Sequence, residues 1–195
     1  MSLSTAWTVF FYGWLVTEIY VAIATRTRKG AGKVSDRGTM LLLWLVIFGS
    51  ITAGLAISGT WGPNPPGLQN AHTIKTAIKT VALVILIFAL VLRWVSIISL
   101  GKSFSANVAV REKQTVYKKG LYRWVRHPSY TGLGLCFVAT GLHTLNWISL
   151  AIIVVFPSAA LLYRIHVEET ALREAFGDEY VNYIRETKRL IPGIF

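Results

Sequence analysis

The sequence is poor in charged residues and in cysteine. Only 15% of its 195 residues carry a charge, and Cys136 is its single cysteine. One cysteine excludes a disulfide within the chain and a cysteine-rich metal site, so we expect no bound metal ion. Because Cys136 lies inside an apolar run, we predict that it is a small buried side chain. A fold stabilised by disulfides or by a cysteine-bound metal is therefore excluded.

Acidic residues are also scarce, with nine Asp and Glu against twenty Lys and Arg. The resulting net charge of +11 would suit a protein that binds nucleic acid. The basic residues, however, lie in short polar segments beside long apolar runs, which is the distribution that the positive-inside rule describes. Hydrophobic residues make up 53% of the chain, and its mean hydropathy is +0.51. We therefore predict an integral membrane protein without a nucleic-acid partner.

Five apolar runs predict an all-α, polytopic membrane protein that forms a single domain over residues 1–195. The fourth and fifth runs are joined at Asn146, which predicts a helical hairpin. The fourth is short, because fifteen residues at ~1.5 Å each span roughly 22 Å of a ~30 Å hydrocarbon core. The first has neither a basic leader nor a cleavage site, so we expect a retained span. The five predicted spans are about 7–24, 40–58, 76–100, 131–145 and 147–163.

The basic residues also predict the orientation of the chain. Five Lys and Arg follow the first span, seven lie between the third and fourth spans, and five follow Tyr163. With five spans, seventeen of the twenty fall on one side of the membrane, which we predict to be the cytoplasm. The N-terminus would then lie outside and the C-terminus inside. No internal repeat is visible, which disfavours an inverted-repeat transporter.

A first polar cluster lies in residues 122–132, which combine two arginines, a histidine, two tyrosines and a tryptophan. Pro128 restricts His127 to an extended conformation and suits the first turn of a helix, so we expect the fourth helix to begin there. Free N–H groups at a helix N-terminus bind carboxylates or phosphates, and aromatic faces attract cations such as sulfonium groups. The alternative is an interfacial belt, because Arg, Trp and Tyr collect at membrane borders.

A second polar cluster, residues 164–169, continues the helix of the fifth span. Arg164 and Glu168 are four residues apart and share a helix face, so the spacing predicts that Glu168 faces the interior and Glu169 faces water. The alternative is an ion pair without a function. We expect Gly177 to end this helix. Four apolar or aromatic residues at helical spacing are interpreted as packing: Leu172, Phe176, Tyr180 and Tyr183.

Two charged residues lie within predicted spans, Glu18 in the first and Arg93 in the third. Such groups mark ion or substrate pathways in transporters, which would make the chain a non-catalytic membrane protein. Each lies within about two turns of a predicted cytoplasmic end, where a long side chain can reach the interface or find a partner. We therefore interpret both residues as structural.

Several short motifs fall in the two clusters. They are Gly120-Leu121-Tyr122, then Arg126-His127-Pro128-Ser129-Tyr130-Thr131-Gly132, then Glu168-Glu169-x-x-Leu172 and Phe176-Gly177-x-x-Tyr180. In this pattern, which extends over about residues 103–192, the chain resembles the isoprenylcysteine carboxyl methyltransferase family. As a whole it resembles a prokaryotic, archaeal-type member with a minimal set of spans. The wider group also contains membrane phospholipid methyltransferases, and the motifs are less specific for the substrate than for this group.

The resemblance implies a membrane methyltransferase that uses S-adenosyl-L-methionine. Segments 101–130 and 164–195 would form a small cytosolic cofactor-binding region, with the active site facing the cytoplasm. A monomer in membrane lipids would methylate the carboxylate of an isoprenylcysteine-type substrate. The implied catalytic residues are Arg164, which would bind the substrate carboxylate, and Glu168. The implied cofactor-binding residues are Gln114, Thr115, Val116, Tyr117, Tyr122, His127, Pro128, Ser129, Tyr130 and Glu168.

Other acceptors remain open alternatives, namely a phospholipid or another small lipophilic amine or thiol. A carboxylate is already a nucleophile at neutral pH, so its methylation needs no general base. An amine must first lose a proton, and His127, His166 or Glu169 would then serve as the base.

Overall fold

The computed structural model describes residues 1–25, 33–34, 38–60, 71–101, 109–110 and 115–195. The described chain is helical, as predicted, apart from an antiparallel pair of two-residue strands, in which Lys33 lies opposite Val110. The elements in chain order are α1 (Leu3–Ala24), β1 (Lys33–Val34), α2 (Thr39–Thr60), α3 (His72–Leu100), β2 (Ala109–Val110), the 3₁₀-helix η2 (Gly120–Arg123), α4 (Pro128–His143), α5 (Trp147–Phe176) and α6 (Asp178–Glu186).

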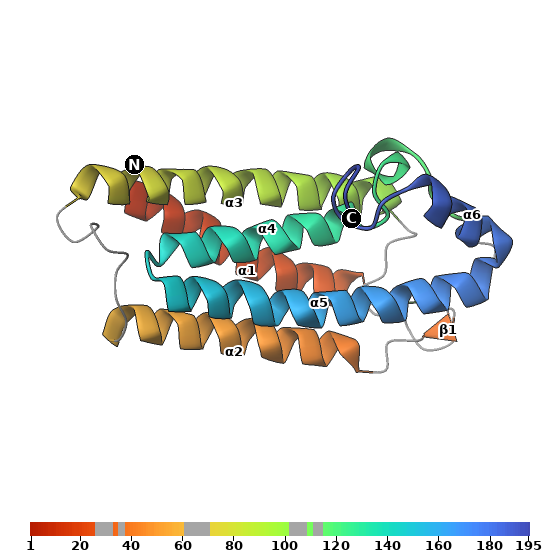
Figure 1. Ribbon diagram of the computed structural model, residues 1–195, viewed down its shortest axis with the longest axis horizontal. Coiled ribbons are helices and arrows are strands. Elements are labelled where there is room, and N and C mark those ends of the chain that lie inside the picture. Colours follow the sequence, from red (N-terminus) through yellow and green to blue (C-terminus); the bar gives the residue numbers. More distant parts are fainter. Residues whose placement is uncertain (26–32, 35–37, 61–70, 102–108, 111–114) are drawn as a thin grey trace.

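Helices α1 to α5 run along the long axis of the molecule, and α6 lies at one end (Figure 1). Helix α3 packs against α4 and α1, while α5 packs against α2 and α4. Helices α4 and α5 form the predicted hairpin around Asn146, whose side chain accepts a hydrogen bond of 3.0 Å from the N–H of Ser149 and so caps α5. The hairpin is thus the centre of the bundle, with α3 and α1 on the side of α4 and α2 on the side of α5.

Four of the described helices, α1, α2, α3 and α5, are long and apolar enough to cross a membrane. Helix α4 has 16 residues, and at ~1.5 Å per residue it falls short of a ~30 Å hydrocarbon core. The fourth predicted span, residues 131–145, therefore stays a prediction, and with it the total of five spans. Helix α5 has 30 residues and runs well past the predicted end of its span at Tyr163. Residues 164–169 therefore lie within this helix, beyond the predicted end of the span.

Two helix boundaries follow from local chemistry. Pro128 is the first residue of α4, and His127 precedes it, as the sequence predicts. The ring of proline sets the backbone angle of a first turn, and its missing N–H costs no helical hydrogen bond there. Gly177 separates α5 from α6 with a φ of +52°, a conformation that glycine adopts without strain. Both predicted boundaries are confirmed.

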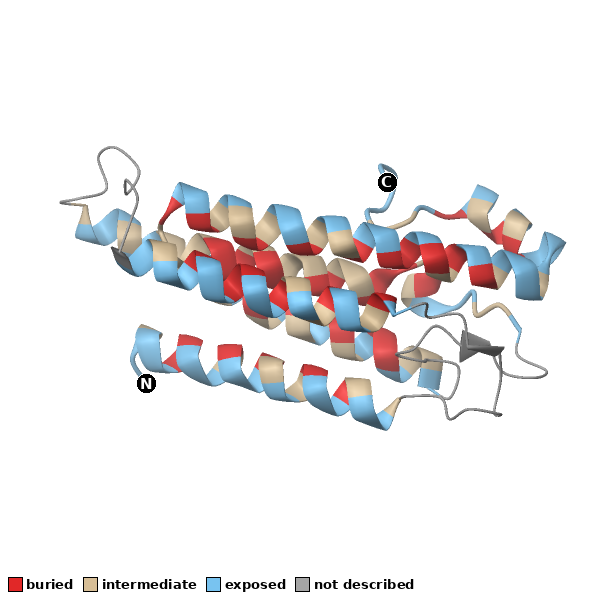
Figure 2. Cartoon of the chain, turned by 90° about the horizontal axis from the view of Figure 1, so that it is seen from below, coloured by how far each residue is buried: buried red, intermediate tan, exposed pale blue. Residues whose placement is uncertain are grey.

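Buried residues lie on the helix faces that turn toward the middle of the bundle, and exposed residues lie on the outer faces (Figure 2). Leu86, Phe137 and Cys136 are fully buried, which confirms the prediction for the cysteine. Large hydrophobic residues such as Leu45 and Phe88 are exposed on the outer helices. A soluble protein rarely exposes so much apolar surface, whereas lipid covers it in a membrane.

The ends of the helices bring the polar segments together. The C-terminal ends of α1 and α3, the N-terminal ends of α2 and α4, and helix α6 all lie at the same end of the bundle (Figure 1). We call this the polar end. Residues 115–127 and 164–195 belong to it, so the two polar clusters of the sequence meet there, although residues 133–163 separate them in the chain.

We expect Gly132→Ala to lower the free energy of unfolding by about 1–3 kcal/mol. A Cβ atom at this position would lie 2.8 Å from the carbonyl oxygen of Ala89 and 3.0 Å from the backbone nitrogen of Arg93, so α3 and α4 would have to separate. Thermal unfolding in detergent measures the effect. The control is Gly134→Ala on the same helix, where a Cβ meets nothing within 4 Å. Equal midpoints for the two variants would contradict this account.

Candidate functional site

The polar end contains an open cleft with about 720 Å³ of empty space, part of which is open to solvent. We call it the polar cleft. It lies between η2, the start of α4, the end of α5 and α6. Its lining residues are Leu100, Thr115, Val116, Tyr117, Tyr122, Arg126, His127, Ser129, Tyr130, Glu168, Leu172, Phe176, Tyr180 and Tyr183.

Most of the cofactor-binding residues expected from the sequence lie around this cleft. Eight of the ten line it: Thr115, Val116, Tyr117, Tyr122, His127, Ser129, Tyr130 and Glu168. Pro128 is buried at the start of α4 and fixes its neighbours rather than lining the cleft. Gln114 lies outside the described residues.

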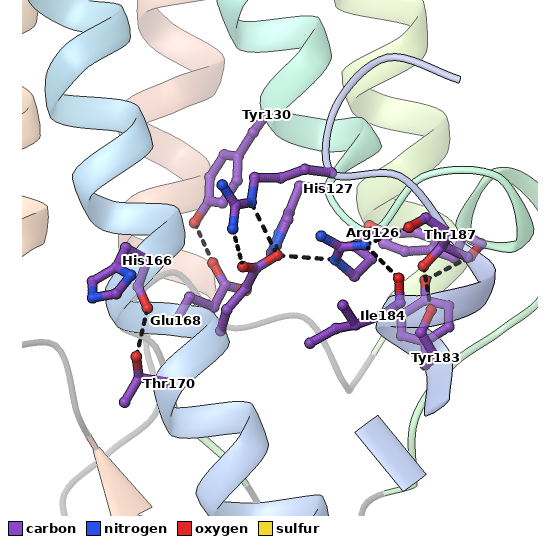
Figure 3. Close-up of polar contacts among 12 residues, drawn as sticks. Arg126, His127, Tyr130, His166, Glu168, Thr170, Tyr183, Ile184 and Thr187 are labelled. Atoms are coloured by element: carbon purple, nitrogen blue, oxygen red, sulfur yellow. Dashed lines mark hydrogen bonds and ion pairs between the residues drawn. The ribbon is translucent and has the colours of Figure 1, made fainter. Parts of the chain in front are cut away.

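The carboxylate of Glu169 is the centre of a hydrogen-bond network at the polar end (Figure 3). It accepts hydrogen bonds from Arg126 at 2.9 Å and from Arg189 at 2.7 Å, and it lies 3.3 Å from Nε2 of His127. The prediction that Glu169 faces water is wrong, because the residue is only 2% exposed. The prediction from the i,i+4 spacing assumed that only one face of α5 is buried. Here Arg126 and Arg189 pack on a second face of the helix and bury Glu169 as well.

Backbone hydrogen bonds join the first polar cluster to the C-terminal segment. The N–H of Arg126 donates to Lys188 at 2.8 Å, the N–H of His127 donates to Arg189 at 3.1 Å, and the N–H of Lys188 donates to Trp124 at 3.2 Å. The side chain of Arg126 also donates to the carbonyl oxygen of Thr187. The segment after α6 therefore fixes one side of the polar cleft, which the sequence pattern did not indicate.

Aromatic residues form another wall of the polar cleft. The hydroxyl of Tyr183 donates to the carbonyl oxygen of Tyr122, whose own hydroxyl donates to Ser96 at 3.3 Å. Burial raises the pKa of both phenols, so they remain donors. Tyr117 contacts Tyr122 edge to face, with 5.6 Å between the ring centres. These contacts hold η2 against α3 and α6.

Helix α6 and the end of α5 contribute residues that the sequence analysis interpreted as packing. Leu172, Phe176, Tyr180 and Tyr183 all line the polar cleft. The hydroxyl of Tyr180 is buried and has no hydrogen-bond partner within the described part of the chain. An unpaired buried hydroxyl costs free energy, so this group is suited to a polar ligand. In the sequence, the helical spacing of Tyr180 and Tyr183 could have indicated that both hydroxyls lie on one face of α6.

A second cavity, with about 560 Å³ of empty space that is partly open to solvent, lies next to the polar cleft and among the apolar helices. We call it the apolar cavity. Its walls come from α1 and α2, through residues such as Trp14, Leu15, Leu43 and Ile47, and from Leu133 on α4. Arg164 lines this cavity, and Tyr130 lines both the cavity and the polar cleft.

Tyr130 connects the two residues expected to carry the chemistry. Nε of Arg164 donates to the Tyr130 hydroxyl at 3.0 Å. This hydroxyl donates to Glu168 at 2.8 Å (Figure 3). Arg164 is 2% exposed and also donates to the hydroxyl of Thr39 at 3.0 Å. Glu168 is half-buried. The two residues therefore share the inner side of α5, as the sequence predicts.

Glu18 and Arg93 lie in the wall of the apolar cavity and form an ion pair with each other. Each is 6% exposed. The sequence analysis gave both a structural role, in which each reaches the interface or finds a partner, without naming that partner. The pair is buried between α1 and α3 instead of reaching the interface.

Comparison with known proteins agrees with the motifs. The sequence model of the isoprenylcysteine carboxyl methyltransferase family matches residues 81–174. This segment of the chain is similar to members of that family. An Arabidopsis thaliana protein-S-isoprenylcysteine O-methyltransferase B is 32% identical over 65% of this chain and 64% of its own length. The Saccharomyces cerevisiae protein-S-isoprenylcysteine O-methyltransferase is 32% identical over 64% of this chain and 53% of its own length.

One further sequence relative and one solved structure are also similar to this chain. A Mycobacterium tuberculosis methanethiol S-methyltransferase is 39% identical over 37% of this chain and 28% of its own length. The structure of a eukaryotic intramembrane Ras methyltransferase superposes with a TM-score of 0.62 at 20% identity, covering 98% of this chain and 65% of that chain. The chain thus spans less than two thirds of the length of these relatives. Together with the four apolar helices, this fold identifies an integral membrane protein.

We expect Glu169→Gln to lower the free energy of unfolding by roughly 3 kcal/mol, because buried Arg126 loses the charge that compensates its own. Thermal unfolding in detergent at neutral pH measures the loss. Glu186→Gln is the control, since Glu186 is exposed at the last turn of α6. A Glu169→Gln midpoint equal to that of the control would show that the network contributes nothing to stability.

Proposed function

We propose that the protein transfers a methyl group from S-adenosyl-L-methionine to the carboxylate of an isoprenylcysteine-type lipophilic substrate. One observation carries the proposal: the Tyr130 hydroxyl, which joins Arg164 to Glu168, lies where the polar cleft meets the apolar cavity. A polar cofactor and a lipophilic acceptor would approach this point from opposite sides. The names of the family and of its relatives support the same activity.

The residues of the polar cleft fit the proposed cofactor. When bound, S-adenosyl-L-methionine supplies a methyl group activated by a sulfonium charge. Aromatic faces such as those of Tyr117 and Tyr122 attract a cation, and Glu168 suits an amino group. The N-terminus of α4 and the hydroxyl of Tyr180 would bind polar groups.

The apolar cavity fits the proposed acceptor. Its lining is mostly hydrophobic, which suits a prenyl chain. The buried guanidinium of Arg164 provides positive charge where the apolar cavity adjoins Tyr130. The hydroxyls of Tyr130 and Thr39 hold this guanidinium. A carboxylate bound there would face Tyr130 and the polar cleft beyond it. Arg164 would therefore orient the nucleophile, and the cavity would keep water away from it.

Methylation of a carboxylate releases no proton, so positioning and desolvation are sufficient for catalysis. The three residues that could act as a base for an amine are unsuited to that role. His127 and Glu169 contact each other in the buried network, and His166 is exposed on the side of α5 away from His127 (Figure 3). The geometry therefore favours a carboxylate over an amine.

A thiol is the second candidate acceptor, because one relative is named for the methylation of methanethiol. A free thiol has a pKa of about 8.5 and is partly ionised near neutral pH. Arg164 would then stabilise a thiolate in place of a carboxylate. The lining of the apolar cavity favours a lipophilic thiol over methanethiol itself.

We also propose that the polar end faces the cytoplasm and that the protein acts as a monomer. In the sequence, seventeen of the twenty basic residues fall between α1 and α2, between α3 and α4, or after Tyr163, which is the distribution that the positive-inside rule gives for a cytoplasmic side. The cofactor would then enter from the cytosol and the acceptor from the bilayer.

Product analysis tests the reaction. We expect the purified protein in lipid nanodiscs to transfer a labelled methyl group from S-adenosyl-L-methionine to a small prenylcysteine analogue. The product should be a methyl ester, which dilute base hydrolyses with release of labelled methanol. A base-stable thioether or methylamine would indicate a different acceptor. Absence of both transfer and S-adenosylhomocysteine binding would contradict the methyltransferase assignment.

We expect Arg164 and Glu168 to separate acceptor and cofactor functions. Arg164→Ala should remove turnover and leave S-adenosylhomocysteine binding intact, because Arg164 lines the apolar cavity and not the polar cleft. Glu168→Ala should weaken the binding itself, since Glu168 lines the cleft. Calorimetry of S-adenosylhomocysteine binding to both variants gives the comparison. Equal losses of affinity in the two variants would contradict the assignment of the cofactor to the polar cleft and of the acceptor to the apolar cavity.

A further inference from the structure

The buried ion pair of Glu18 and Arg93 has no part in the reaction as described above. Arg93 donates through Nε and NH2 to the two carboxylate oxygens of Glu18, which also accepts a hydrogen bond of 3.3 Å from the indole of Trp14. Charged groups within membrane helices are costly, so a pair that persists there is a candidate for function. Both residues lie in the wall of the apolar cavity.

The remaining terminal nitrogen of Arg93 reaches a different helix. NH1 donates to the carbonyl oxygen of Ser129 at 3.1 Å and to its hydroxyl at 3.0 Å. Ser129 is the second residue of α4, and Tyr130 follows it directly. The guanidinium therefore links α1, α3 and the first turn of α4, next to the tyrosine that joins the two cavities.

The backbone at Arg93 is held as firmly as its side chain. Gly132 lies so close to α3 that an added Cβ would be 3.0 Å from both the backbone nitrogen and the Cβ of Arg93. The arginine thus extends from a fixed point beside the first turn of α4, and Glu18 fixes its far end. Because both the backbone and the guanidinium of Arg93 are held in place, its hydrogen bonds to Ser129 restrict the position of that residue.

We propose that Arg93 and Glu18 are positioning residues for methyl transfer: Arg93, neutralised and oriented by Glu18, clamps the first turn of α4 through Ser129 and so fixes the Tyr130 hydroxyl between cofactor and acceptor. This inference rests on the proposed function. Neither residue reacts in it. The competing account is that the pair only attaches α1 to the bundle.

A double variant separates the two accounts. Replacing a buried ion pair by apolar residues of similar volume often leaves stability unchanged or raises it. We expect Glu18→Leu with Arg93→Met to unfold at or above the wild-type temperature, to bind S-adenosylhomocysteine normally, and to lose about 10- to 100-fold in kcat, since small displacements at a reacting centre have effects of this size. A stable double variant with wild-type kcat would overturn the proposal.

A single variant tests the clamp if the double variant fails to fold. Arg93→Lys keeps a positive charge beside Glu18, but an ammonium group lacks the planar fork that reaches Glu18 and Ser129 together. We expect wild-type unfolding temperature and KM, with a reduced kcat. Val91→Leu, at an exposed position on the same helix, is the control and should leave kcat unchanged.

A spectroscopic measurement tests the position of Tyr130 without turnover. With 3-fluorotyrosine at position 130, the wild type in nanodiscs should give one sharp fluorine resonance. The Arg93→Lys variant should give a broadened or split resonance, because the first turn of α4 is no longer clamped. An unchanged resonance would overturn the clamp. An inactive wild type would instead overturn the proposed function, so the two failures are distinguishable.

Discussion

The polar end depends on one buried carboxylate. Glu169 lies on α5, yet its oxygens bind Arg126 from the segment before α4 and Arg189 from the segment after α6. A buried charge is stable only when opposite charges and hydrogen bonds surround it, so these three segments must keep one arrangement. The shape of the polar cleft and the entry of the chain into α4 follow from that arrangement.

The membrane places a second constraint on the site. Within the bilayer the backbone must be helical, so irregular segments and the residues that they carry collect at the helix ends. As a result, a polar cleft at the helix ends adjoins an apolar cavity between the helices. Tyr130 lies at the border because it belongs to the first turn of α4, where the chain enters the helical bundle. The proposed reaction needs such a border, since its two reactants differ in polarity.

Local sequence signals determined the helices and most of the candidate site. Apolar runs gave the positions of α1, α2, α3 and α5, and Pro128 and Gly177 set helix boundaries that the structure confirms. These features depend on hydrophobic length, proline geometry and glycine conformation, which are properties of neighbouring residues. The motifs around His127 and Glu168 indicated the polar cleft, because a family resemblance carries information that periodicity lacks.

Only the tertiary structure decided which charged groups meet. The i,i+4 rule selected Glu168 as the inward acid and Glu169 as the outward one, but the C-terminal segment covers α5 on a further side and buries Glu169 more deeply. In the same way, Glu18 and Arg93 are 75 residues apart, and nothing local in the sequence pairs them. Helix periodicity describes one helix at a time. The ion-pair partners of a residue on other helices depend on how α1, α3, α4 and α5 pack together. That packing depends on contacts throughout the bundle and not on neighbouring residues in the sequence.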